Sequence, residues 1–312
     1  MKILFMGTPD FALKILDTLI NSEEHEIIGV YTQPDRPAGR GSKLTMSPVK
    51  IRSLEKNIPC HQPEKIKNID DVNILKSVVE KHKPDVFIVA AYGQILSQEI
   101  LDMPRYGCIN VHASILPKYR GAAPIHWAII NGEQKSGVTI MQMEKGLDTG
   151  DILNIVETPI FPQTTFANLH DELATIGGVA LMDTLRNIEK YQENKIKQDN
   201  ELSSYAPMID KNTSKIEWEK HTSTDIRNII QALGAWTTFE GTTIKFFDID
   251  IIDNRTYESS GKVLQSSPKD GIMVSTLSGA IKINELQKQG GKRLKAPDFL
   301  NGFGLEVGKS FI

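Results

Sequence analysis

Two side chains that could perform chemistry together lie in the segment 107–114, which reads GCINVHAS. Asn110 and His112 are two residues apart in an apolar run that predicts a short strand, so both should point to one face of a sheet. An amide donor beside an imidazole can stabilise an oxyanion while the imidazole moves a proton. The same pair could instead be an asparagine and a histidine whose hydrogen bonds are satisfied in a turn. The spacing alone leaves both interpretations open.

Two further segments could add to this group. Residues 115–124, ILPKYRGAAP, combine apolar residues, two cations and two prolines, and loops of this kind between sheet elements often carry function. Residues 146–151, GLDTGD, place Asp148 in a turn, where a lone aspartate is most often a turn-forming residue. A carboxylate close to His112 would instead fix the tautomer of the imidazole. The sequence does not decide whether Asp148 lies there.

Other kinds of site lack their usual residues. The first strand-to-helix turn reads GTPDF rather than GxGxxG, and Pro9 removes a backbone donor that a phosphate would use. The sequence contains no Walker A motif, no GxSxG, no HxxxH and no CxxC. Its two cysteines, Cys60 and Cys108, exclude a disulfide framework and supply no metal-binding cluster. Dinucleotide, metal and serine-hydrolase sites are therefore disfavoured, and we expect no bound metal.

The elements that must position these residues follow an α/β pattern over the first 190 residues. Apolar runs predict strands at 2–6, 27–32, 86–91, 109–111 and 138–142. Helical periodicity predicts helices from residue 9, over 71–82 and over 165–193. Thr8 is expected to cap the first helix and Pro9 to occupy its first position. The alternation of strands and helices favours a mostly parallel sheet.

The pattern changes after residue 200, where short strands alternate with turns. Strands are expected at 243–247, 262–265, 273–276 and 281–286, separated by regularly spaced glycines and preceded by a helix at 223–233. This spacing favours a small β-barrel or sandwich. We therefore divide the chain into a catalytic domain at 1–190, a linker at 191–206 and a smaller domain at 207–312.

The composition bounds the class of protein. Of 312 residues, 40% are hydrophobic and 24% are charged, which is a globular balance. A net charge of −3 excludes a generally basic nucleic-acid binder, although local basic clusters can still bind RNA. The sequence contains no apolar run of about 18 residues and no secretory signal. We expect a protein of the cytoplasm, with no membrane partner.

The residues match a known family. The segments 110–124 and 147–151 together resemble the formyltransferases that use 10-formyltetrahydrofolate. The similarity is fuller to the methionyl-tRNA formyltransferase family, and it covers nearly the whole chain. Further matching segments are 7–11 (GTPDF), 32–41 (TQPDRPAGRG), 91–93 (AYG), 137–143 (GVTIMQM), 216–218 (IEW) and 291–293 (GKR). This resemblance implies a Rossmann-like domain followed by an OB-like β-barrel.

The resemblance also implies a reaction, in which the α-amine of methionine on initiator tRNA attacks the formyl carbon of the folate. Asn110 and His112 would stabilise the oxyanion, and Asp148 would keep His112 protonated and receive the amine proton through water. The folate is expected at Ser114, Ile115, Leu116 and Pro117, and at the backbone of Gln94, Ile95 and Leu96. The tRNA is expected at Arg36, Arg40 and Lys43 and at Lys288, Lys292 and Arg293, on a protein that is expected to be a monomer.

Three alternatives remain open at this point. The same catalytic core could formylate an amino sugar nucleotide or another small amine. Water could replace the amine, which would give hydrolysis of the formyl-folate. A non-enzymatic RNA-binding protein could keep the fold, although it would have no use for Asn110, His112 and Asp148.

The basic loop at 33–47 generates one testable expectation. Substitution Arg40→Ala should weaken use of the acceptor tRNA, because a loop cation can contact phosphates and end bases. Binding of the folate should not change. Steady-state kinetics with each substrate varied in turn separate the two effects, and an equal loss in both would mean that the loop is only structural.

Overall fold

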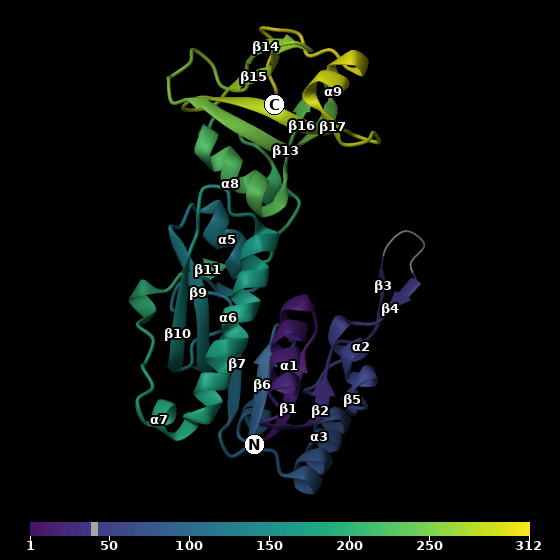
Figure 1. Cartoon of the computed structure of the whole chain (residues 1–312), viewed down its shortest axis with the longest axis vertical. Helices are drawn as coiled ribbons and strands as arrows, with labels where there is room; N and C mark the ends of the chain where they lie inside the picture. The colour runs from purple at the N-terminus through teal and green to yellow at the C-terminus, as the bar shows by residue number, and fades with distance from the viewer. Residues whose placement is uncertain (39–42) are drawn as a thin grey trace. The chain divides into compact units, whose positions relative to one another are not determined.

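The computed structural model describes residues 1–38 and 43–312, which form two compact units (Figure 1). The first unit contains Met1–Pro124, Lys135–Pro159 and Ala167–Ala206. The second unit contains Ile125–Gln134, Ile160–Phe166 and Pro207–Ile312. The chain therefore leaves the first unit twice before its final exit at residue 206.

The first unit is built on a seven-stranded sheet that is parallel except at one edge. In spatial order the strands are β10 (Ile152–Pro159), β9 (Lys135–Gln142), β7 (Cys108–His112), β6 (Val86–Ala90), β1 (Lys2–Gly7), β2 (Glu26–Tyr31) and β5 (Cys60–His61). The strands from β7 to β5 pair in parallel, whereas β9 and β10 pair antiparallel to their neighbours. The predicted α/β class with a mostly parallel sheet is confirmed. The chain order reverses at β1, and ligands in such sheets bind outside the carboxyl ends of the strands near this reversal.

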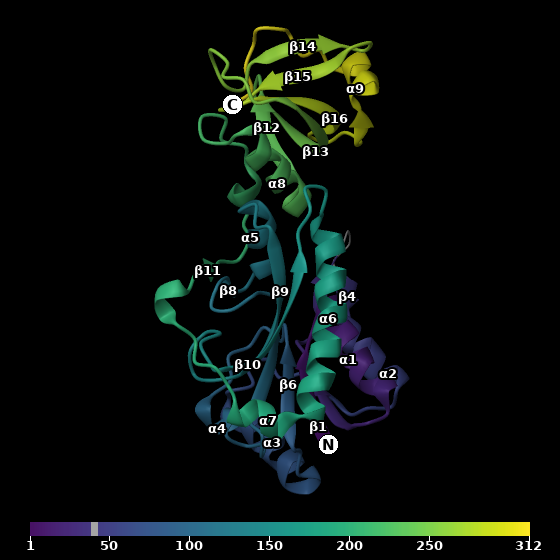
Figure 2. The ribbon, with the colours of Figure 1, turned by 60° about the vertical axis from the view of Figure 1, so that its left-hand side comes forward.

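Helices cover both faces of this sheet. They are α1 (Asp10–Ser22), α2 (Pro48–Glu55), α3 (Ile69–His82), α4 (Gln98–Leu101), α6 (Phe166–Arg186) and α7 (Ile188–Glu193). Leu4 and Met6 pack with α3 in one buried cluster. Helices α1 and α6 lie side by side on the other face (Figures 1 and 2). A Cβ built on Gly178 of α6 would lie 2.5 Å from the Thr18 hydroxyl oxygen of α1, so only glycine allows this close approach.

Several predicted boundaries were wrong, for identifiable reasons. Strand β10 was missed because it forms the sheet edge and carries polar residues along its length. The helix expected over 165–193 is broken at Asn187 into α6 and α7. Thr8 does not cap α1, because its hydroxyl donates to the Tyr92 carbonyl at 3.1 Å, and Pro9 occupies the cap position.

The segment 191–206, expected as a linker, is hydrogen-bonded into the first unit. Ile196 pairs with Ile152 at the start of β10. Farther on, β11 (Tyr205–Ala206) pairs in parallel with β8 (Arg120–Gly121), as Figure 2 shows. Between these contacts lies a short 3-10 turn, Asn200–Leu202. This segment therefore contributes to the architecture of the first unit.

The second unit is a six-stranded antiparallel sheet. Its order is β12 (Ala235–Phe239), β13 (Thr242–Asp253), β16 (Ala280–Lys288), β15 (Gly271–Ser275) and β14 (Val263–Ser267), with β17 (Leu294–Lys295) paired to β16. Helix α8 (Ser223–Leu233) begins at a capping box of Thr222 and Asp225. The remaining elements are α5 (Pro124–Ile130), a 3-10 turn at Asn212–Ser214 and α9 (Ala296–Gly302). A smaller C-terminal domain built on short β-strands was predicted, and the antiparallel sheet confirms this prediction.

The last residues close the sheet of the second unit into a barrel. Ile312 exchanges two backbone hydrogen bonds with Thr238 of β12. On the other side, the Phe311 amide donates to the Gly261 carbonyl and the Val263 amide donates to the Lys309 carbonyl. The barrel encloses aromatic side chains, among which Phe311 contacts the ring of Trp218 at 5.7 Å between centroids.

A small pair of strands, β3 (Arg36–Ala38) and β4 (Lys43–Thr45), belongs to the first unit. Within the described residues, none of the helices is both long and apolar enough for a membrane span.

The first unit should lose stability in mildly acidic solution because of His61. Its ring stacks on Tyr31 at 4.7 Å, and burial lowers the pKa of His61 below its ordinary value of about 6.5. Between the lowered and the ordinary pKa, the unfolded chain binds a proton that the folded chain does not bind. The free energy of unfolding should therefore fall as pH drops through the ordinary value. Urea titrations at pH 7.5 and 5.5 should show a smaller fall for His61→Phe, and identical falls would contradict this assignment.

Candidate active site

The two predicted catalytic side chains of β7 lie within the first unit. Asn110 pairs with Val89 of β6 on one side and with Met141 of β9 on the other. His112 ends the strand, at the carboxyl edge of the parallel sheet. Asn110 and His112 are 9% and 6% exposed, so their polar atoms need partners within the fold.

Asp148 supplies the partner that the sequence did not locate. Its Oδ1 lies 3.5 Å from Asn110 Nδ2, and its Oδ2 lies 3.7 Å from His112 Nδ1. The backbone amide of Gly121 donates to Oδ2 at 2.8 Å. Asp148 has a φ of +51°, in the left-handed region that few non-glycine residues adopt. The structure thus brings the three predicted catalytic residues together, with the partly buried carboxylate of Asp148 between the other two.

The His112 ring is oriented by the loop that follows its strand. Its Nε2 lies 3.0 Å from the carbonyl oxygen of Tyr119. Since a carbonyl only accepts hydrogen bonds, Nε2 must carry the hydrogen in this arrangement. The other nitrogen, Nδ1, faces the Asp148 carboxylate. The two ring nitrogens therefore face two different oxygen atoms, a backbone carbonyl and a carboxylate.

The predicted folate segment 114–117 forms this loop, and two of its side chains are engaged within the protein. The Ser114 hydroxyl donates to the Lys118 carbonyl at 2.7 Å, and Leu116 packs in a small buried cluster. The Thr139 hydroxyl donates to the Ser114 carbonyl at 2.7 Å and accepts from the Leu116 amide at 3.1 Å. Ile115 and Pro117 are partly exposed. The loop is therefore held firmly at the sheet edge.

The second predicted folate segment leaves the same edge of the sheet, after β6. The Gln94 side chain is engaged at both ends, because it accepts from the Ile66 amide at 2.6 Å and donates to the Pro63 carbonyl at 2.8 Å. Leu96 is buried in the core, whereas Ile95 is 77% exposed. Only the Ile95 side chain and the adjoining backbone thus present a surface to a ligand.

The turns after β1, β2 and β6 are tied together at one atom. The carbonyl oxygen of Tyr92 accepts from the Thr8 hydroxyl and from Gln33 Nε2, both at 3.1 Å. These two hydrogen bonds bring segments 7–11, 32–34 and 91–93 together at the carboxyl edge of the sheet, although the segments are far apart in the sequence.

The sequence did not predict three contacts that hold Asp148 and His112 in place: those of Gln198, of Arg120 and of the Tyr119 carbonyl. Gln198 donates to the carbonyl oxygens of Asp148 and Gly150, and Arg120 donates to Gln198. The Tyr119 carbonyl holds His112. Gln198 lies in a polar stretch that gave no periodic signal, and backbone groups carry no signature in residue type. These contacts could not be found without the fold.

The predicted tRNA-binding cations lie in both units, and each unit is considered by itself. Arg36 is largely exposed and pairs with Glu64 at 3.3 Å. Arg40 lies outside the described residues, as does the side chain of Lys43. In the second unit, Lys288 lies 5.1 Å from the Phe303 ring centroid, and Lys292 is exposed. Arg293 contacts Glu285 at 2.6 Å and stacks over Phe247, so part of its charge is neutralised.

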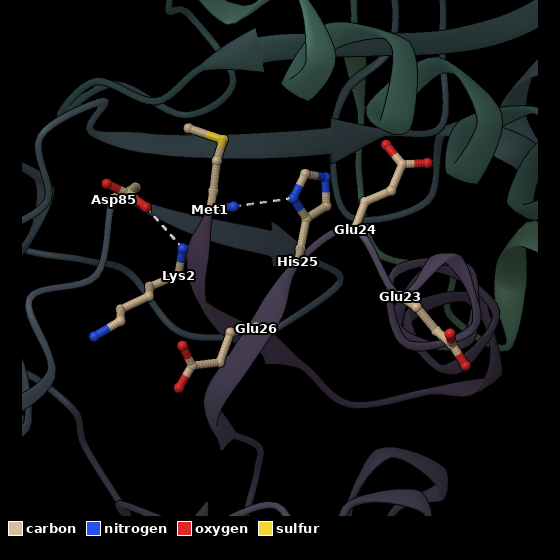
Figure 3. Close-up of a pocket in the computed structure, with 7 residues that line it drawn as sticks. All are labelled: Met1, Lys2, Glu23, Glu24, His25, Glu26 and Asp85. Atoms are coloured by element: carbon tan, nitrogen blue, oxygen red, sulfur yellow. Dashed lines mark hydrogen bonds between the residues drawn. The ribbon is translucent and has the colours of Figure 1, made fainter.

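A separate acidic hollow lies at the opposite edge of the sheet, where β1 begins (Figure 3). The Lys2 amide donates to Asp85 at 2.7 Å, and the Met1 amine lies 3.3 Å from His25 Nδ1. Burial, followed by the charge of the Met1 amine, lowers the pKa of His25. The hollow lies at the amino end of β1, so it is distinct from the group around Asp148. Among residues 1–38 and 43–312, no group of three or more His, Cys, Asp or Glu side chains could hold a metal ion.

Comparison with known proteins now decides the family. Residues 1–185 match the formyl transferase family model, and residues 208–304 match the model of the formyl transferase C-terminal domain. The methionyl-tRNA formyltransferase of Clostridioides difficile is 43% identical, over 99% of this chain and 99% of its own. The enzyme of that name from Clostridium tetani is 46% identical, over 99% and 98%. The chain belongs to the methionyl-tRNA formyltransferase family. The resemblance noted in the sequence is confirmed.

Solved structures of more distant proteins share the fold of this family. The HypX protein of Aquifex aeolicus, solved with tetrahydrofolic acid, has a TM-score of 0.61 at 17% identity and covers 98% of this chain and 50% of its own. An N-formyltransferase from Helicobacter canadensis, solved with folinic acid and dTDP-3-aminofucose, has a TM-score of 0.63 at 20% identity. It covers 91% of this chain and 99% of its own. At these identities the likeness concerns the fold alone.

Gly121 should be intolerant of a side chain. Its φ is +115°, and a Cβ would lie 2.6 Å from the Tyr205 ring and 2.8 Å from the Ala206 carbonyl oxygen. Substitution Gly121→Ala should displace the amide that donates to Asp148 and lower turnover by roughly 10²-fold, as small misplacements in active sites do.

Gly241→Ala is the matched control, because Gly241 also has a positive φ but has nothing within 4 Å of a built Cβ. Turnover and melting temperature should be measured for both variants. Comparable turnover in the two would show that the Gly121 amide does not position Asp148.

Proposed function

We propose that this chain transfers the formyl group of 10-formyltetrahydrofolate to the α-amine of methionine on initiator tRNA. One observation carries the proposal: Asn110 Nδ2 and His112 Nδ1 both approach the Asp148 carboxylate, at 3.5 and 3.7 Å. Attack of an amine on a formyl carbon needs donors for the developing oxyanion and an acceptor for the amine proton. This group of side chains contains both.

Asn110 and His112 provide the donors. The Asn110 contact to Asp148 is long for a hydrogen bond, so the amide can donate to a substrate oxygen. His112 Nε2 is held by Tyr119, while the Nδ1 contact at 3.7 Å is too long for a hydrogen bond and leaves this N–H available. One such donor contributes about 2.7–4 kcal/mol to stabilisation of the transition state.

Asp148 has two tasks in this mechanism. Its carboxylate faces Nδ1 of His112 and keeps this side of the ring turned toward the site. It also accepts the proton that the attacking amine loses, directly or through a water. The bond between the formyl carbon and the folate nitrogen then breaks as that nitrogen takes up the proton that the amine lost, which completes the transfer. The Gly121 amide keeps the carboxylate in place during both steps.

The formyl donor fits the carboxyl edge of the sheet. Exposed Ile95 offers an apolar surface there, and the backbone from residue 91 to 96 offers peptide donors and acceptors. Ser114, Ile115, Leu116 and Pro117 would then act mainly by shaping the loop, because Ser114 and Leu116 are occupied within the protein. The donor supplies the activated formyl carbon, and the chain's residues orient it toward Asn110 and His112.

The acceptor requires basic surfaces. We assign these to Arg36, Arg40 and Lys43 in the catalytic domain, 1–190, and to Lys288, Lys292 and Arg293 in the C-terminal domain, 207–312. Residues 191–206 join the two. We further propose that the chain acts as a monomer in the cytoplasm, where charged initiator tRNA is used. Light scattering after size exclusion tests the monomer.

The deciding experiment supplies 10-formyltetrahydrofolate with methionyl initiator tRNA, free methionine or a dTDP-amino sugar. Formyl-methionine released after deacylation is measured in the first two arms. Formylation of the tRNA alone supports the proposal. Formylation of the amino sugar, or consumption of the folate without an acceptor, would overturn it in favour of a small-amine transferase or a hydrolase.

Asn110→Ala and His112→Ala should each lower kcat by roughly 10²–10³-fold, the usual effect of removing one oxyanion donor. The fold should survive, so the circular dichroism and the melting temperature of each variant should stay close to those of the wild type. Asn73→Ala, on the exposed surface of α3, is the control. Near-normal kcat in either active-site variant would exclude this mechanism.

A further inference from the structure

Gln198 lies outside the matched motifs, yet its amide group contacts the backbone that carries Asp148. Gln198 Nε2 donates to the Asp148 carbonyl oxygen at 2.8 Å and to the Gly150 carbonyl oxygen at 2.7 Å. Both hydrogens of one amide nitrogen are therefore used on two carbonyls of the same turn. This contact fixes the peptide that follows Asp148.

The orientation of the Gln198 amide is itself determined. Its Oε1 accepts from Arg120 Nε at 3.0 Å and from Arg120 Nη2 at 2.7 Å. Arg120 Nη2 also donates to Asn200 Oδ1 at 3.0 Å. If the amide were turned over, its NH₂ would face the guanidinium and its oxygen would face two carbonyls. Only the observed orientation satisfies every group.

The turn needs such support because its backbone is strained. Asp148 adopts a left-handed φ of +51°, which a non-glycine residue adopts only when the surrounding structure imposes it. Because the carboxylate belongs to this same residue, rotation of the 148–149 peptide would move the carboxylate away from Asn110 and His112. Gly121 holds the carboxylate, whereas Gln198 holds the backbone behind it.

We propose that Gln198, oriented by Arg120, is a positioning residue for Asp148 in the formyl-transfer step. The inference rests on the proposed function. Gln198 touches neither reacting group and acts through the geometry of the turn. The segment 191–206 would then determine the catalytic geometry as well as join the two parts of the chain.

The informative substitution is Gln198→Glu. The carboxylate keeps the length of the side chain and its pairing with Arg120, but it cannot donate to either carbonyl. We expect kcat to fall by roughly 10²-fold, as for a misplaced catalytic group, with little change in KM for the folate or the tRNA. Arg120→Met, which frees the amide to rotate, should lower kcat in the same direction by a smaller factor.

Gln231→Glu is the matched control. Gln231 also donates its amide to a backbone carbonyl, that of Pro162 at 2.6 Å, but it does so in the second unit. The same change of charge and the same loss of a donor should leave kcat unchanged there. An equal loss in Gln231→Glu would attribute the effect to general stability.

A double-mutant cycle with Asp148→Asn separates positioning from a merely structural role. If Gln198 acts through Asp148, Gln198→Glu should cost less than about 3-fold in single-turnover rate when Asp148 is already replaced. Multiplication of the two single losses would overturn the proposal, as would a loss below about 3-fold in Gln198→Glu alone.

A readout that does not need activity keeps this test apart from the proposed function. Nitrogen NMR of the His112 ring should shift in Gln198→Glu in the same direction as in Asp148→Asn, and it should not shift in Gln231→Glu. Unshifted His112 signals in Gln198→Glu would overturn the positioning role. Failure of the wild type to formylate tRNA, with the ring signals shifting as expected, would overturn only the proposed reaction.

Discussion

The catalytic unit is organised around one requirement, that a mostly buried carboxylate must be matched by donors. The Asp148 side chain is 14% exposed, and an ionised group at such a position is costly unless it is paired. The Gly121 amide and Asn110 donate to it, and His112 Nδ1 faces it at 3.7 Å. Each of these donors requires its own support, which is why the loop after β7 and the turn after β9 are fixed so closely. The groups that surround the carboxylate are the groups that the proposed mechanism uses.

The chain segment between the two matched domains belongs to this arrangement. Strand β11 pairs with β8, and so it places the Gly121 amide, while Gln198 reaches the turn of Asp148 from the same segment. Two of the supports of Asp148 therefore come from residues that lie between the matched segments 147–151 and 216–218. A boundary drawn at residue 190 would separate the group around Asp148 from residues that hold it in place.

The sequence predicted features that depend on residues close together in the chain, and it did not predict contacts between residues that are far apart in the chain. Asn110 and His112 were recognisable because a two-residue spacing on a strand fixes a common face. The glycines of the second unit likewise marked its turns. Asp148 was recognisable only by resemblance, because no local pattern brings residue 148 to residue 112. Thr8 satisfied a helix-cap pattern but bonded to Tyr92 instead, since a distant carbonyl competed for its hydroxyl. Gln198 carried no pattern, because its role lies in backbone atoms remote in sequence.

Closure of the second unit by its last residues has a consequence for handling the protein. Ile312 is bonded to β12, and residues 308–311 are bonded to the chain that enters β14. Removing these residues would leave two unpaired strand edges facing solvent and would uncover the aromatic core beside Phe311. Unprotected edges recruit strands from other molecules, so such a truncation would favour self-association. An affinity tag is therefore better placed at the amino end, which takes no part in this closure.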